Sequence, residues 1–297
     1  MFSWCPSVTD PTWLQVIIWR SIKALLNLRH LTLYPYFSKI PVDLHALTEL
    51  ESISILGTPR TGADQLSDNL AKLYASSPRL TSLEVRHNQR SKLNNLHHLF
   101  HIYNDKSPPR RLRHLGLDFC FVRLDKVTLP HLRHLTSLNL RLDQVGQDVT
   151  PGIVDIASSP DEIWKNFIGF GIHLQELKLY LIATSLIDYL LSYSGLKKLH
   201  LTVTDSESDN REQADLFFNK CLVNHADTLE ELILIACEEG PWNFCSNNSR
   251  SIAKCTKLKF LALNLFLETR PPHWDFCYAD VVVSRSLTMF CCPITLL

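Results

Sequence analysis

The sequence predicts an α/β fold in which strand and helix units repeat along the chain and stack on one another. A leucine-rich hexapeptide recurs through most of the 297 residues, and several segments between its copies have the periodicity of amphipathic helices. Apolar residues make up 45% of the chain and charged residues 20%, which is typical of a globular protein that buries a sizeable core. These observations predict a parallel sheet with helices on one side.

The hexapeptide has the pattern L-x-x-L-x-L, in which Ile or Val can replace Leu. In an extended strand alternate side chains share one face, so the second and third apolar positions, such as Leu115 and Leu117 in LRHLGLDFC, point the same way. No copy can bury that face alone, and stacking is expected to join the copies into one apolar face. Nine copies begin at Leu28, Leu50, Leu80, Leu112, Leu135, Leu174, Leu196, Leu229 and Leu258.

Four connectors between these strands are predicted to be helical, because their leucines and aromatic residues are three or four positions apart. They are residues 63–75, 92–103, 184–193 and 211–225. The units of 22 or 23 residues are expected to leave room only for an irregular connector or a short 3₁₀ segment. The stretch 179–196 approaches the length of a membrane span and holds only Asp188 as a charge, but its Thr, Ser and Tyr residues favour a buried strand followed by an amphipathic helix.

The repeat resembles the unit of leucine-rich-repeat proteins, L-x-x-L-x-L-x-x-N/C-x-L, over about residues 28–266. The resemblance implies a curved solenoid of about nine irregular repeats, with a parallel sheet on the concave side and helices and irregular connectors on the convex side. In that family the ninth position turns the chain and hydrogen-bonds neighbouring backbones. This position holds Asn88, Cys120 and Cys237 in three copies and Thr58, Asp143 and Thr204 as partial substitutes, whereas Tyr36, Ile182 and Phe266 depart from the pattern.

Two flanking segments complete the predicted organisation. Residues 1–27 contain the apolar stretch WLQVIIWRSI at 13–22, which predicts an N-terminal helical cap or the remnant of a preceding module. Residues 267–297 are apolar and lack the repeat pattern, so they are predicted to form an atypical C-terminal cap or tail.

The variable unit lengths and connectors such as SSPRLTSLEV and HADTLEELIL resemble the repeat region of F-box/leucine-rich-repeat proteins of the fungal type. That resemblance implies recruitment of a substrate to a cullin-type ubiquitin ligase. The F-box itself, a helical module that grips the ligase adaptor, is not evident before Leu28.

Enzyme chemistry is not expected. His97 and His101 in HHLFH lie one helical turn apart, but His98 replaces the Glu of the zinc motif H-E-x-x-H. The string GFGIHL, from Gly169, lacks the third glycine of a dinucleotide-binding loop, and neither a P-loop nor a nucleophile elbow is found. We therefore predict no catalytic residues, no cofactor and no metal.

The charge balance and the cysteines limit the classes of partner. Thirty Lys and Arg residues balance thirty Asp and Glu residues, so no chain-wide field attracts nucleic acid or anionic lipid. The nine cysteines lack the short paired spacings of a disulfide framework, and the N-terminus lacks the features of a secretory signal. We expect a cytoplasmic or nuclear protein with no nucleic-acid or membrane partner.

The strand positions that alternate with the apolar ones predict the functional surface. On a solenoid they form the concave face, where Arg and Tyr offer contact area and directed hydrogen bonds to a protein partner. The predicted partner-binding face comprises Tyr34, Glu84, Arg86, His114, Asp118, Asn139, Arg141, Glu176, Lys178, Tyr180, Lys198 and His200. The last two units add the apolar residues Ile233, Ile235 and Phe260, which the C-terminal segment is a candidate to cover.

The expected function is that of a protein interaction module, the substrate-recognition repeat region of an F-box-like ubiquitin-ligase receptor. Its partner would be a protein on the concave face, with a ligase adaptor as a second partner if an F-box is supplied. The alternative is a free-standing leucine-rich-repeat scaffold or regulator unrelated to ubiquitin.

Overall fold

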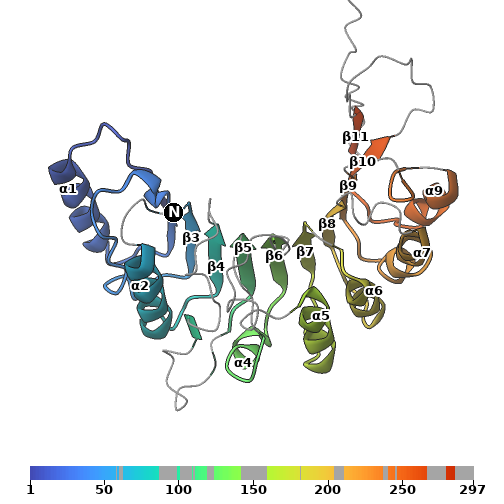
Figure 1. Ribbon diagram of the computed structural model, residues 1–297, viewed down its shortest axis with the longest axis horizontal. Coiled ribbons are helices and arrows are strands. Elements are labelled where there is room, and N and C mark those ends of the chain that lie inside the picture. Colours follow the sequence, from blue (N-terminus) through green and yellow to red (C-terminus); the bar gives the residue numbers. More distant parts are fainter. Residues whose placement is uncertain are drawn as a thin grey trace, which may run out of the picture. The chain divides into compact units, whose positions relative to one another are not determined.

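The computed structural model of the chain consists of two compact units, Met1–Ile172 and His173–Leu297. Strands alternate with helices in both units (Figure 1), so the predicted α/β class is confirmed. The structure describes residues 1–57, 59, 63–86, 99–100, 109, 111–118, 124–141, 159–180, 182–203, 211–236, 240–244, 246–265 and 279–284.

Six strands that pair in sequence order, with parallel pairing throughout, form the sheet of the first unit. They are β1 (Phe2–Trp4), β2 (His30–Leu33), β3 (Ser52–Leu56), β4 (Ser82–Arg86), β5 (His114–Asp118) and β6 (Ser137–Arg141). The helices of this unit are α1 (Thr12–Lys23), the 3₁₀ helix η1 (Pro35–Phe37), α2 (Ala63–Ser76), α4 (Leu129–Leu132) and α5 (Pro160–Gly169). Figure 1 shows α2 and α4 on the same side of these strands.

The second unit contains four parallel strands and a fifth strand that is antiparallel to its neighbour. The strands are β7 (Glu176–Leu179), β8 (Lys198–Val203), β9 (Glu231–Ala236), β10 (Phe260–Leu265) and β11 (Ala279–Ser284). The helices are α6 (Thr184–Leu191), α7 (Arg211–Leu216), the π-helix η4 (Phe217–Cys221), α8 (Leu222–Asn224) and α9 (Ser246–Ala253).

The nine hexapeptide copies coincide with strands β2 to β10, in the register that the pattern predicts. In the first unit Leu31, Ile53, Leu83, Leu115 and Leu138 are register partners on successive strands. In the second unit the same row is formed by Leu177, Leu199, Leu232 and Leu261. All of these side chains are buried except Leu261, which is partly exposed, so each unit has one apolar layer beneath its sheet.

A second regularity lies in the backbone just before each strand. The carbonyl of the second hexapeptide residue accepts two N–H groups from the next unit: Glu51 accepts from Thr81 (2.9 Å) and Ser82 (3.1 Å), and Lys197 accepts from Glu230 (2.7 Å) and Glu231 (3.0 Å). The carbonyls of Arg29, Thr81, Arg113, Gln175 and Glu230 accept in the same way. Within each unit, each repeat is thereby fixed to the next at an equivalent position, although the connectors differ in length.

The connectors agree with the predicted helices in most cases. The structure has α2 where a helix is expected at 63–75 and α6 where one is expected at 184–193. The helix expected at 211–225 is divided into α7, η4 and α8. Only residues 99 and 100 of the segment 92–103 are described, and both are helical.

The prediction for the short units holds only in part. The first short unit contains η1, as expected, and the second contains α4, a single turn of α-helix. The unit that begins at Leu174 contains the eight-residue α6, which agrees with the helix predicted from residue spacing at 184–193 and shows that the limit inferred from the length of the unit is wrong there. Such a helix is only about 12 Å long, and the chain reaches it four residues after β7.

The π-helix η4 contains two consecutive aromatic residues, Phe217 and Phe218, and both are buried. Their rings lie 5.2 Å apart and pack against the buried Trp242 at 5.4 and 6.2 Å. The three rings thus form one aromatic cluster at this turn.

Helix α5, which the periodicity did not predict, has a strong signal at each end. Ser159 and Glu162 form a reciprocal capping box, with Pro160 at the first helical position. At the other end Gly171 has a φ of 62°, and the N–H groups of Gly171 and Ile172 donate to Ile168 and Phe167, which is the Schellman motif. The string GFGIHL is therefore a helix terminus.

The structure adds a strand to each flanking segment. The helix expected at 13–22 is present as α1, and Trp19 on α1 stacks on Trp4 of β1 at 5.4 Å. The three-residue β1 pairs with β2 and is too short to show a pattern. In the C-terminal segment, β11 pairs with the edge of β10.

Candidate partner-binding face

The twelve predicted residues lie on the strands or directly after them, on the side opposite the buried leucines, and none is buried. Each unit carries its own part of the surface. The first-unit face comprises Tyr34, Glu84, Arg86, His114, Asp118, Asn139 and Arg141. The second-unit face comprises Glu176, Lys178, Tyr180, Lys198 and His200.

On the first-unit face, Glu84 contacts residues of its own strand and of the two neighbouring strands. Its Oε1 accepts from Nε of Arg86 at 2.9 Å and from Nη2 at 2.6 Å. Its Oε2 accepts from the hydroxyl of Ser54 on β3 at 3.0 Å. On the other side lies Gly116 of β5, where an added Cβ would be only 2.8 Å from Cγ of Glu84. Glycine at this position therefore leaves room for the glutamate.

Two further contacts connect β5 and β6. Nδ1 of His114 lies 2.9 Å from the hydroxyl of Ser137. Asp118 and Arg141 are register partners, with Nε of the arginine 3.8 Å from a carboxylate oxygen. The acids and the arginines of this face are thus in contact with one another.

The second-unit face has the same kind of pairing between strands. Nζ of Lys198 lies 2.8 Å from Glu176, and this hydrogen bond raises the pKa of the lysine above its ordinary value. Nε2 of His200 lies 2.7 Å from Oε1 of Glu231. Within β7 and its extension, Lys178 lies over the ring of Tyr180, 5.5 Å from its centroid.

These ion pairs fix the directions of side chains more than they stabilise the fold. Exposed pairs contribute about 0 to 1 kcal/mol each, whereas a guanidinium or an ammonium that is already oriented loses less entropy when it binds. The faces consequently present oriented side chains of positive and of negative charge. This mixture suits a polar protein surface better than a polyanion.

The apolar end of the second-unit face is in part open. Ile235 is 44% exposed, and Ile233 and Phe260 are partly exposed. Strand β11 pairs beside β10, at the edge of the sheet. The predicted cover of this part by the C-terminal segment falls on residues that, apart from β11, lie outside the described ranges.

The described cysteines differ in exposure. Cys5 is exposed, whereas Cys221 and Cys255 are buried. Burial raises the pKa of Cys221 to about 12 and that of Cys255 to about 11, so neither thiol is an effective nucleophile near neutral pH.

No group of three His, Cys, Asp or Glu residues that would suit a metal ion occurs within the described ranges. His97, His98 and His101 lie outside them, as do Asn88, Cys120 and Cys237 and the partial substitutes at the ninth position.

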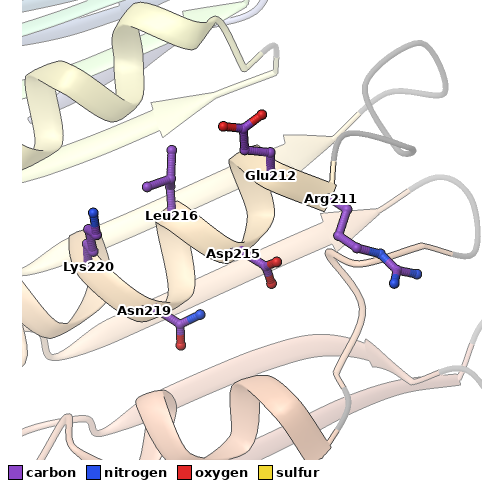
Figure 2. A pocket seen from close by; sticks show the side chains of 6 residues that line it. All are labelled: Arg211, Glu212, Asp215, Leu216, Asn219 and Lys220. Carbon is purple, nitrogen blue, oxygen red and sulfur yellow. The ribbon is translucent and has the colours of Figure 1, made fainter.

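A shallow hollow of about 550 Å³ lies along α7 and η4. Figure 2 shows that its six side chains come from this one stretch of helix, with Asp215 and Asn219 pointing to one side and Glu212 and Leu216 to the other. A hollow lined by one helix lacks the converging polar groups of a small-molecule site.

The outer surface of α1 is a feature that the sequence reasoning missed. Gln15, Trp19 and Ile22 are buried, whereas Trp13 is 64% exposed and Ile17 is 52% exposed. These two residues are one turn apart and form an apolar surface. The signal was available, because α1 is apolar on more sides than one buried face requires.

The sequence matches no protein-family model and no curated protein. Among the described helices, none combines the length and the apolar character needed to cross a membrane.

Proposed function

We propose that this chain is a leucine-rich-repeat protein whose exposed strand faces bind a protein partner. The observation that carries the proposal is the register of the repeats, which places every second strand residue in rows, mostly polar, on the side of the sheet opposite a buried leucine layer. Hydrogen-bonded polar groups with a neighbouring apolar part, as at His200 and Ile235, match the mixture of polar rim and apolar core found in protein interfaces.

The more specific proposal is that the chain recognises substrates for an F-box-like ubiquitin-ligase receptor. It rests on the resemblance of the repeats, and the apolar surface of α1 supports it, because Trp13 and Ile17 offer a contact for an adaptor protein. A free-standing scaffold would use the same strand faces without a ligase adaptor.

The face proposal predicts that Ile235→Glu abolishes capture of the partner. The substitution puts a charge into the apolar part of the second-unit face, and loss of an apolar contact that binding would bury typically weakens binding about tenfold or more. The measurement is an affinity pull-down from cell extract with quantitative mass spectrometry. Glu212→Lys, an exposed change on the helical side of the same unit, is the matched control and should capture the partner normally. Equal capture by both variants would contradict the face proposal.

The ligase proposal predicts that adaptor and cullin subunits are recovered in the same pull-down. Trp13→Glu with Ile17→Glu is expected to remove them, because both changes place charges on the apolar surface of α1, whereas capture of the partner by the strand faces should persist. Recovery of a partner without any ligase subunit by the unaltered chain would favour the scaffold instead.

A further inference from the structure

We propose that Arg86 binds a carboxylate of the protein partner and that Glu84 is its positioning residue. This inference rests on the proposed function, because it names the chemical group that the first-unit face recognises. Both hydrogen bonds from Arg86 to Glu84 leave from the Nε side of the guanidinium, through Nε and Nη2. The guanidinium is planar and has a second pair of parallel donors on the edge between Nη1 and Nη2. That end-on edge is left for an external group.

Glu84 is held from two sides, and it therefore holds the guanidinium in one orientation. Ser54, Glu84 and Gly116 are register partners on β3, β4 and β5. The Ser54 hydroxyl donates to the second carboxylate oxygen of Glu84 at 3.0 Å. On the β5 side, the glutamate side chain occupies the space that a Cβ on Gly116 would need.

The two members of the pair differ in their access to solvent. The Glu84 side chain is 18% exposed, and that of Arg86 is 46% exposed. Among the described residues, Glu84 is the only side-chain partner of the Arg86 guanidinium. The enclosed carboxylate thus acts as a support, and the guanidinium is the part that reaches a partner.

The surrounding charges favour a carboxylate over a phosphate as the external group. A carboxylate fits the end-on edge with two parallel hydrogen bonds. Asp118 is the register partner of both Arg86 and Arg141, so two acids and two arginines share this part of the face. A doubly charged phosphate would meet stronger repulsion from Glu84 and Asp118 than a singly charged carboxylate.

The experiment selects binders from a random-peptide display library with the full chain as the target. Hydrogen exchange of the complexes then identifies the peptides that protect β4 and β5. We expect these face-binding peptides to share an Asp or Glu at one position. Changing that residue to Asn or Gln, or making Arg86→Lys in the protein, should weaken binding about tenfold, and the two changes together should cost little more than either one.

The positioning role of Glu84 is tested separately with two substitutions. Gly116→Ala should displace Glu84, release Arg86 and weaken the same peptides about two- to tenfold, which is the range expected for one side chain that must be ordered on binding. Ser54→Ala removes the other hold on Glu84 and should act in the same direction, so the test does not depend on the folding of one variant. Arg79→Lys is the control. Arg79 forms an ion pair with Glu49, with 2.9 Å between nitrogen and oxygen, and neither residue belongs to a strand.

Face-binding peptides without a shared acid, or with equal affinity for Arg86→Lys, would overturn the role of Arg86 and leave the face proposal standing. If no selected peptide protected the strands, both proposals would fall. A loss with Arg86→Lys but none with Gly116→Ala or Ser54→Ala would refute the positioning role of Glu84.

Discussion

Leu115→Asp is expected to abolish folding of the first unit. Leu115 is 1% exposed and lies in the buried row between Leu83 and Leu138. Removal of a buried leucine side chain alone costs about 2 to 5 kcal/mol, and a buried carboxylate without a partner adds several kcal/mol. The sum is comparable with the whole stability of a typical domain, about 5 to 15 kcal/mol. Circular dichroism and urea denaturation of the purified variant would measure the loss.

The matched control is Arg86, which lies on the open side of the neighbouring strand β4, three residues after Leu83. Arg86→Asp introduces the same side chain at an exposed position, where water solvates it, and the variant should unfold within about 1 kcal/mol of the parent chain. Similar stability of Leu115→Asp and Arg86→Asp would mean that the strand register is wrong.

The chain should lose about 2 to 3 kcal/mol of stability through His225 alone as the pH falls from 7 to 4.5. His225 is buried between two repeats: Nδ1 accepts from the N–H of Leu196 at 3.3 Å, and Nε2 lies 3.0 Å from the carbonyl of Leu190. Burial lowers the pKa of His225 from 6.5 to about 4. The unfolded chain therefore takes up a proton first, and acid favours unfolding between these two values at about 1.4 kcal/mol per pH unit.

Urea denaturation at several pH values tests this prediction through His225→Gln. At pH 7 the variant should be less stable, because glutamine does not refill the buried space of the imidazole ring. The difference in the free energy of unfolding between the parent chain and the variant should narrow by about 2 to 3 kcal/mol on acidification, because glutamine does not titrate. His173→Gln, at an exposed position in the same unit, should keep the acid dependence of the parent chain. If the stability difference between His225→Gln and the parent chain did not change with pH, His225 would not be the cause of the loss of stability in acid.

The strand register was predictable from the sequence because the two-residue period admits only one assignment of buried and open faces. Leu115 and Leu117 are buried, and Asp118, which points to the opposite side of β5, is partly exposed, as the alternation requires. Strand β1 was missed because three residues carry no period. Helix α5 was missed because the prediction relied on leucine spacing, although Ser159, Pro160 and Glu162 already had the sequence pattern of a capped N-terminus.

The composition of the face was predictable, but its internal pairing was not. Alternation placed Glu84 and Arg86 on the same face, two residues apart. It gave no indication that Gly116 on the next strand makes space for the glutamate or that Ser54 holds it from the other side. Such contacts join residues about 30 positions apart along the chain, and they depend on rotamers and on the absence of a side chain, neither of which a period reveals.

The carbonyl before each of these strands accepts two N–H groups from the next repeat. The distance between neighbouring strands therefore does not depend on the number of residues in the connector. Glu51 and Lys197 accept their two bonds in the same way, although the connectors that follow them differ in length and in type of helix. An insertion or deletion in a connector therefore need not shift the next strand. In evolutionary terms, the outer side of each unit can change its length while the polar rows that meet a partner keep their alignment.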